Sequence, residues 1–203
     1  MPKIAAPTVA EHHDRQRRAL LDAAVAILQE GGVAAVTPAA VGSRAGLARS
    51  SVYQYFGSGA EIIATVVEEA FPPANAVLAA ALEGIADPLE RVDTYVATTL
   101  RLGAAGAHRV AAALSAAELP VGCRERLRDL HREQARPLLD AVAGLGCPSP
   151  ALAAALAGGV VQAALTQVEA GRPVTEVTQR ALQLLHRGLP GCTSAEEDAA
   201  APR

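Results

Sequence analysis

The sequence lacks tryptophan, and Lys3 is the only lysine among its 203 residues. Alanine, leucine, valine and arginine are abundant instead, a bias typical of GC-rich coding. We therefore treat most of the alanine as background, although it strongly favours helices. The sequence also lacks internal repeats and the alternation of apolar and polar residues that marks a half-buried strand. These absences predict an all-α fold.

Cysteine is scarce as well. Cys123, Cys147 and Cys192 are odd in number and far apart, so they indicate neither a disulfide framework nor a zinc site. We interpret them as reduced thiols, with a thiol sensor as the alternative. The first residues do not have the pattern of a secretory signal peptide, and together these features favour a cytoplasmic protein.

Catalytic motifs are missing too. The chain has no nucleophile elbow, phosphate-binding loop, paired-cysteine motif or pair of histidines at zinc-binding spacing. Isolated residues such as His108, His131 and Glu118 are more often structural or exposed than catalytic. We therefore predict that the protein is not an enzyme and that it has no catalytic residues, metal ligands or cofactor.

An uncharged run at residues 141–168 raises the question of a membrane span. Its length would suffice, because a spanning helix needs about 20 apolar residues. Pro148, Pro150, Gly158 and Gly159 interrupt the run, however, and favour a buried helix. We expect no membrane partner.

The charge distribution limits contact with nucleic acid to one region. The net charge of -3 argues against a protein that coats nucleic acid with its whole surface. Residues 1–60 nevertheless carry six Lys or Arg against four Asp or Glu. Any contact with DNA should therefore involve this part of the chain.

Residues 37–56, TPAAVGSRAGLARSSVYQYF, predict two short helices joined by a tight turn. Thr37 can cap the first helix, proline follows at the first helical position, and Gly46 can adopt the left-handed conformation that ends the helix. A second helix from about Arg49 places Val52 and Phe56 on one side. Its other side carries Arg49, Ser50, Ser51, Gln54 and Tyr55. This pattern is typical of a helix-turn-helix, whose second helix lies in the major groove of DNA.

The segment from Arg18 to Ile63 resembles the N-terminal module of the TetR (tetracycline-repressor-like) family of bacterial transcription regulators. The matching positions are Leu20-Leu21, Ala23-Ala24, Ile27-Leu28, Gly32, Thr37, Ala45-Gly46-Leu47, Ser51-Val52-Tyr53 and Tyr55-Phe56. The resemblance implies a homodimer that binds a near-palindromic operator in double-stranded DNA, with recognition helices about 34–36 Å apart or a multiple of that distance. It also implies a small-molecule effector.

The resemblance assigns roles to individual residues. Arg49 and Gln54 would read bases, and Ser50 and Ser51 would contact bases or phosphates. The residues expected to bind phosphates are Thr37, Tyr53 and Tyr55.

Two positions depart from the family pattern. Ala48 replaces a small polar residue, so the second helix should lack a side-chain cap. Gly59 stands where the family usually has a lysine that meets a phosphate. Backbone N–H groups at Gly59 could still bind a phosphate. With one charge–charge contact fewer, we expect lower affinity for DNA.

The predicted organisation comprises a helix-turn-helix domain with an N-terminal arm and a linking helix at 1–72, a helical effector-binding and dimerisation domain at 73–190, and a disordered acidic tail at 191–203. Outside the helix-turn-helix, helices are expected at residues 11–30, 60–71, 74–84, 88–103, 105–118, 121–144, 150–170 and 174–188. Pro137 should kink or split the helix at 121–144.

A pocket is expected among the helices between residues 88 and 170. Its candidate polar residues are Tyr95, His108, Arg109, Glu118 and His131. Four of the five aromatic residues lie in or beside the DNA-binding part. The pocket therefore favours an aliphatic or small polar effector over a large planar cation.

The last two helices are the candidates for a subunit interface, because two-fold packing as a four-helix bundle would cover their apolar stripes. The residues of this predicted interface are Leu152, Leu156, Val160, Leu165, Val177, Ala181, Leu184 and Leu185. The alternative is that they belong to the core of a single chain.

The sequence thus predicts a DNA-binding repressor that a small-molecule effector releases from a palindromic operator. Two alternatives stay open. One is a regulator without such an effector, controlled by a protein partner or by thiol chemistry. The other is a helical protein that binds apolar ligands and has lost DNA binding.

Overall fold

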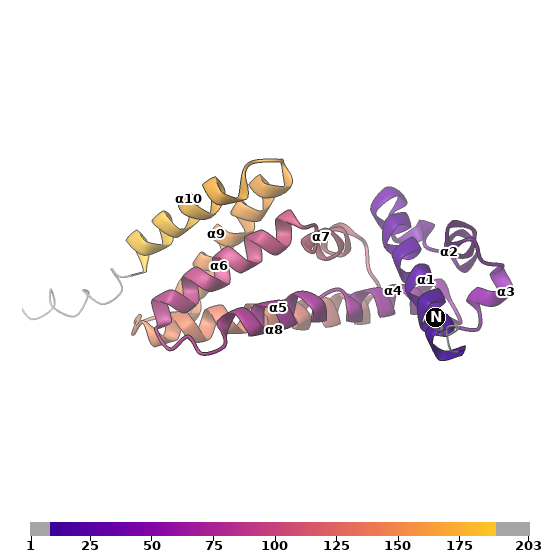
Figure 1. Ribbon diagram of the computed structural model, residues 1–203, viewed down its shortest axis with the longest axis horizontal. Helices are drawn as coiled ribbons and strands as arrows, with labels where there is room; N and C mark the ends of the chain where they lie inside the picture. The colour runs from indigo at the N-terminus through magenta and orange to yellow at the C-terminus, as the bar shows by residue number, and fades with distance from the viewer. Residues whose placement is uncertain (1–8, 190–203) are drawn as a thin grey trace, which may run out of the picture. The chain divides into compact units, whose positions relative to one another are not determined.

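A computed structural model describes residues 9–189, and over that range the chain forms helices and no strand (Figure 1). The all-α prediction is therefore confirmed for the described part. The helices are α1 (Val9–Gly31), the 3₁₀ turn η1 (Val33–Ala35), α2 (Pro38–Ala45), α3 (Arg49–Val52), α4 (Gly59–Glu69), α5 (Pro72–Leu82), α6 (Pro88–Ala104), α7 (His108–Ala116), α8 (Val121–Gly144), α9 (Pro150–Glu169) and α10 (Val174–Gly188). Cys192 and the predicted tail at 191–203 lie outside the described residues.

Proline acts differently from the prediction at two places. Pro72 and Pro73 do more than end α4, because they also occupy the first two positions of α5, where their missing N–H groups cost no helical hydrogen bond. Pro137 lies inside α8, yet the helix continues from Val121 to Gly144. Pro137 therefore does not split this helix, and the other predicted outcome, a kink, stays a prediction.

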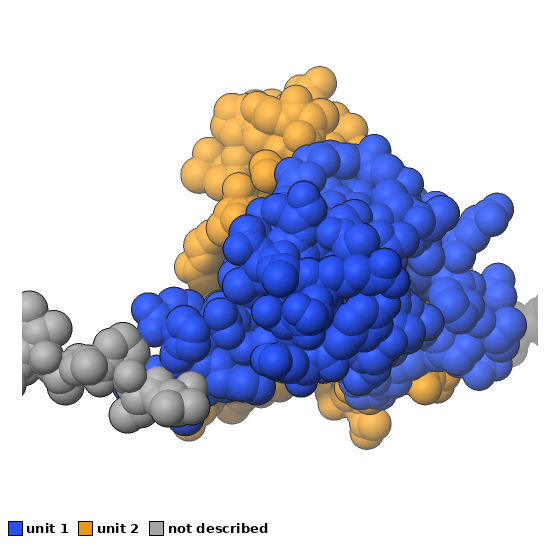
Figure 2. All heavy atoms as spheres, turned by 90° about the vertical axis from the view of Figure 1, so that its right-hand side faces the viewer, with its two compact units in different colours: residues 1–70, 110–128 blue, residues 71–109, 129–203 orange. Residues whose placement is uncertain are grey.

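The chain divides into two compact units, shown in different colours in Figure 2. Unit 1 comprises residues 1–70 and 110–128, and unit 2 comprises residues 71–109 and 129–203. The predicted boundary at residue 72 is close to the first change of unit. The sequence predicted two contiguous domains and placed residues 110–128 in the second, whereas the structure places them in unit 1.

Unit 1 is built around α1, which packs against α2 and α4. Leu20 and Ala24 on α1, Val41 on α2, and Ile62 on α4 are fully buried. Ion pairs join the same helices at the surface. Both guanidinium nitrogens of Arg44 donate to Glu30, at 2.5 and 2.6 Å, and Arg17 lies 2.6 Å from Glu69.

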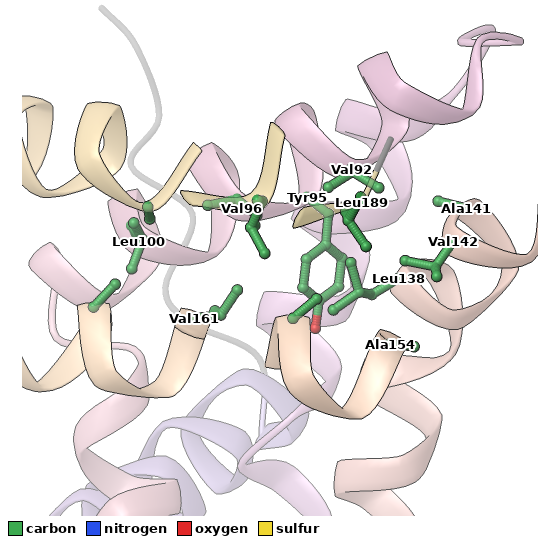
Figure 3. Close-up of a cluster of buried hydrophobic side chains, with 14 of the residues drawn as sticks. Val92, Tyr95, Val96, Leu100, Leu138, Ala141, Val142, Ala154, Val161 and Leu189 are labelled. Atoms are coloured by element: carbon green, nitrogen blue, oxygen red, sulfur yellow. The ribbon is translucent and has the colours of Figure 1, made fainter. Parts of the chain in front are cut away.

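Unit 2 is built around α6, which packs against α5, α9 and α10. Its core cluster is aliphatic apart from Cys147 and Tyr95, and the Tyr95 ring lies beside Leu138 in Figure 3. Val92, Val96 and Leu100 project from α6 into the same core and are fully buried. Their spacing follows the helical repeat, which explains why one face of α6 is covered.

Two helical stretches are long and apolar enough to cross a membrane by length and composition alone, residues 59–82 and Pro150–Glu169. Core helices of soluble proteins meet the same criterion, so this finding is weak support for a membrane span.

The core of unit 2 yields a first prediction. Leu100→Ala should lower the free energy of unfolding by about 2–5 kcal/mol, because it removes a fully buried side chain and leaves a cavity. Val77→Ala on α5 is the control, since Val77 is 43% exposed and should change stability by about 0.5 kcal/mol or less. Urea denaturation measures both. Equal losses would contradict the described core.

Candidate nucleic-acid interface

The first helix of the candidate interface, α2, begins and ends as its sequence predicts. Thr37 is extended, and its hydroxyl oxygen accepts a hydrogen bond from the Ala40 N–H at 3.2 Å. Gly46 has a φ of 70° and ends the helix in the left-handed conformation. The Leu47 N–H then donates to the Gly42 carbonyl oxygen at 2.8 Å. Capping at both ends fixes the direction in which the chain enters the next helix.

The second helix, α3, is shorter than predicted. It spans one turn, Arg49–Val52, instead of continuing to Phe56. Ala48 provides no side-chain cap, as the sequence indicated. After α3 the chain continues in tight turns, in which the Tyr55 N–H donates to the Val52 carbonyl oxygen at 2.9 Å. Phe56 is still buried beside Val52 in the core of unit 1.

Packing holds α3 in place. Val52 is fully buried, and a Cβ added at Gly42 would lie 2.8 Å from the Val52 Cγ2 atom. Such a distance is too short for any side chain at position 42. The absence of a side chain at Gly42 therefore allows α2 and α3 to approach closely.

Four polar side chains of the predicted reading surface are exposed around α3. They are Arg49, Ser50, Tyr53 and Gln54, whereas Ser51 is half-buried. Arg49 and Tyr53 form a pair, because the Arg49 Nη2 donates to the Tyr53 hydroxyl at 3.0 Å and the guanidinium carbon lies 5.5 Å from the ring centroid. The expected base reader and the expected phosphate ligand thus hold each other in position.

Tyr55 does not share this exposed face, contrary to the prediction. It is half-buried, and its hydroxyl donates to the Gln16 Oε1 atom of α1 at 2.7 Å. The His13 ring lies 4.4 Å from the Tyr55 ring, centroid to centroid. Tyr55 therefore joins α1 to the end of the helix-turn-helix. Gln16 is a positioning residue that the sequence did not reveal, since it lies 39 positions away.

The start of α4 explains the glycine at position 59. A Cβ added there would lie 2.5 Å from the Val36 carbonyl oxygen, so a lysine does not fit this backbone. The Ser58 hydroxyl oxygen accepts from the Glu61 N–H at 3.1 Å, and the Glu61 carboxylate accepts from the Gly57 N–H at 2.7 Å. The first turn of α4 is thus capped internally and carries a negative charge, which makes it a poorer phosphate site than predicted.

Arginines of unit 1 divide into paired and exposed groups. Arg17 is 2.6 Å from Glu69 and lies over the Phe56 ring at 5.9 Å, so it supports the fold. Arg15 and Arg18 are exposed on α1. The hydrogen bond from Arg44 lowers the pKa of the Glu30 carboxyl group, and the hydrogen bond from Arg126 lowers that of Glu68.

The five predicted effector residues lie in different surroundings. Tyr95 is buried on α6, where burial raises the pKa of its hydroxyl and a hydrogen bond with the Thr99 side chain opposes that shift. The Nδ1 atom of His108 lies 2.9 Å from the Oε1 atom of Glu169. Arg109 and Glu118 are exposed, and Glu118 belongs to unit 1. The His131 ring meets the Phe71 ring edge-on at 4.8 Å.

The predicted interface residues separate into two groups. Leu152, Leu156 and Leu184 are 62%, 66% and 64% exposed, and Val160 is half-buried. The other four are buried in the core of unit 2, so the prediction that they form the subunit interface was wrong: Leu165, Val177, Ala181 and Leu185. The sequence pattern identified the apolar positions of the last two helices, but the buried half of them is covered by the chain itself.

The geometry defines the class of this part of the chain. Two short helices joined by a left-handed glycine turn pack on a longer helix, and the second presents exposed polar side chains. This arrangement is a helix-turn-helix of the kind that binds DNA.

Comparisons with known proteins agree with this class. Residues 20–66 match the family described as "Bacterial regulatory proteins, tetR family". The transcriptional regulator BetI of Rhizobium meliloti (strain 1021) is 28% identical over 115 residues, which cover 57% of this chain and 54% of that protein. The chain thus aligns with about half the length of this curated relative.

Solved structures show the same fold. A TetR-like transcriptional regulator from Rhodococcus sp. RHA1 has a TM-score of 0.72 at 20% identity, covering 87% of this chain and 96% of that one. The regulator FadR from Bacillus subtilis, solved with stearoyl-CoA, has a TM-score of 0.70 at 17% identity, covering 83% and 96%. The family match covers residues 20–66, and the solved structures share the fold of this chain over most of its length.

Position 59 yields the second prediction. Gly59→Lys should lower the free energy of unfolding by about 1–3 kcal/mol, because the new Cβ would collide with the Val36 carbonyl oxygen. Ala60→Lys is the matched control, since it adds the same charge at the exposed neighbouring position. Urea denaturation compares the two variants. Equal stability would contradict the close approach at Gly59.

Proposed function

We propose that the protein is a cytoplasmic, homodimeric repressor that binds a near-palindromic operator and is released by a small-molecule effector. The main support is the exposed polar surface of α3, held by a buried Val52 and by caps at both ends of α2. Side chains fixed in this way can contact base edges with little loss of conformational freedom. The proposal assigns the protein no catalytic activity.

In this proposal Arg49 and Gln54 read bases, and Ser50 and Ser51 contact bases or phosphates. Thr37, Tyr53, the half-buried Tyr55 and the backbone at Gly59 are the remaining candidate contacts. The Arg49–Tyr53 pair supports a reading role for Arg49, because stacking and a hydrogen bond limit the orientations of its guanidinium group. Bidentate contact with guanine suits an arginine held in this way.

Dimerisation is proposed through α9 and α10. Leu152 and Leu156 lie one turn apart on α9, and both are exposed together with Gly159. Leu184 adds an exposed apolar side chain on α10. Water-exposed leucines of this size favour burial against a second copy, and the glycine allows a close approach of helices.

The effector is proposed to bind within unit 2. Release requires that it bind the DNA-incompetent arrangement more tightly, by about 5 kcal/mol for a nearly complete change of population. The B. subtilis FadR structure contains stearoyl-CoA, and the regulator SmeT was solved with triclosan. These two ligands are chemically different, so they do not identify the effector of this chain. Its chemical class has to be inferred from the side chains of unit 2.

The experiment that tests the proposal is a selection of genomic and random DNA duplexes by the purified protein. Recovery of one palindrome, bound by two copies of the chain, is the expected result. If no duplex is retained even at low salt, where electrostatic binding is strongest, the protein is not an operator-binding regulator. A panel of metabolites in a thermal-shift assay then separates an effector-controlled regulator from one without an effector.

Replacing the expected base reader gives the third prediction. Arg49→Ala should weaken binding to the selected palindrome by about 1–3 kcal/mol and relax its sequence preference at one position in each half-site. Arg101→Ala on α6 is the control, because it removes an exposed arginine from unit 2. Fluorescence anisotropy with single-base operator variants measures both effects. Unchanged selectivity would exclude Arg49 as a base reader.

The exposed leucines give the fourth prediction. Leu156→Glu should convert the dimer into monomers at micromolar concentration, because the substitution places a charge in an apolar interface. Val77→Glu is the control, since Val77 is an exposed apolar residue on α5, outside the proposed interface. Sedimentation velocity measures the oligomeric state. A Leu156→Glu variant that remains dimeric would place the interface elsewhere.

A further inference from the structure

Asn75 on α5 has a buried acceptor without a partner. Its Oδ1 atom makes no hydrogen bond to any residue that the structure describes. The residues at helical spacing on the same face, Phe71, Leu78 and Leu82, are all buried. An unpaired buried carbonyl destabilises a fold, whereas leucine would complete this apolar face. The stability of α5 therefore does not explain the asparagine.

Two other polar groups of unit 2 lie along one turn of α8. Phe71 lies one helical turn before Asn75, and its ring meets His131 of α8 edge-on. On the other side, the Tyr95 hydroxyl of α6 donates to the main-chain carbonyl oxygen of Gln134 at 3.4 Å, a long distance for such a bond. One turn of α8, residues 131–134, is therefore contacted by both the start of α5 and the middle of α6.

Asn75 is about 6 Å further along the helix direction than Phe71, because four residues separate them. On the helical face that it shares with Phe71, Asn75 therefore follows the contact between Phe71 and His131 by about one turn. Tyr95 and His131, two of the residues predicted to bind an effector, lie at that turn of α8, whereas Arg109 and Glu118 are exposed and Glu118 belongs to unit 1. The polar groups around α8 thus identify one location for an effector within unit 2.

The surrounding side chains indicate the chemical class of the ligand. The buried cluster of unit 2 is aliphatic except for Tyr95 and Cys147, which suits an aliphatic body. Among the described residues, no charged side chain is buried, and Thr98 is the only buried polar side chain apart from Tyr95 and Cys147. A charged ligand would lose its hydration without gaining a buried counter-charge. A neutral ligand that carries a hydrogen-bond donor would satisfy the Oδ1 atom of Asn75.

We propose that Asn75 anchors the effector, by accepting a hydrogen bond from the hydroxyl or amide N–H group of a neutral aliphatic molecule between α5, α6 and α8. This inference rests on the proposed function and gives its effector a chemical class. Binding pairs the Oδ1 atom, and the aliphatic side chains of unit 2 cover the rest of the molecule.

The test compares two isomeric probes, n-octanol and heptyl methyl ether, because only the alcohol has a donor. Isothermal titration calorimetry on the full-length protein measures their affinities for the wild type, for Asn75→Leu and for the control Val77→Leu on the exposed side of α5. The wild type and Val77→Leu should bind the alcohol about 5–10-fold more tightly than the ether. Asn75→Leu should lose this preference.

Thermal unfolding without a probe provides a second readout. Asn75→Leu should raise Tm by about 2–4 °C, because the unpaired acceptor is replaced by an apolar side chain. Asn75→Ala removes the amide without adding volume, and it should also lose the preference for the alcohol. A lower Tm of Asn75→Leu, combined with an unchanged preference, would show that Asn75 supports the fold and would overturn the proposal. Failure of the wild type to bind n-octanol would overturn it as well.

The DNA selection on the same wild-type protein separates this inference from the proposed function. A retained palindrome without preference between the probes would overturn the inference alone. A preference that depends on Asn75, without any retained duplex, would support the ligand site and overturn the regulatory role.

Discussion

The close approach of Val52 to Gly42 fixes the part of the protein that is proposed to face DNA. α3 has a single turn and no side-chain cap, and a helix of this length is not stable by itself. Its orientation comes from Val52, which is fully buried and lies too close to Gly42 for any side chain there. Tertiary packing, and not helix propensity, therefore determines where Arg49 and its exposed polar neighbours are presented.

Local chemistry explains which parts of this module could be predicted. The Thr37 cap and the Gly46 turn depend on residues within a few positions of each other, so the sequence reveals them directly. Tyr55 depends on Gln16 of α1, and Gly59 depends on the Val36 carbonyl oxygen. Both contacts join segments whose proximity follows from the fold. The sequence therefore indicated an exposed Tyr55, whereas the structure shows Tyr55 hydrogen-bonded to Gln16 of α1. It also indicated a missing phosphate contact at Gly59, whereas the structure shows that the backbone there lies close to the Val36 carbonyl oxygen.

The last two helices show a second limit of sequence patterns. Leu165 of α9 and Val177 of α10 are buried within unit 2, while Leu152 and Leu156 are exposed on another side of α9. A helix that is apolar on more than one side must be covered from more than one direction. Periodicity identifies the apolar positions, but only the packed chain separates those covered internally from those left for a partner.

The arrangement of charges in unit 1 suggests how binding energy and specificity are divided. Arg17 and Arg44 are neutralised by carboxylates of the same unit, and Glu61 places a negative charge at the start of α4. Among the described residues up to position 60, the remaining arginines are Arg15, Arg18 and Arg49. Few cations of this N-terminal part are thus available to release counterions from DNA, and non-specific affinity depends on that release. If α3 reads base edges as proposed, its hydrogen bonds contribute a larger share of the affinity, and binding is more selective and less dependent on salt.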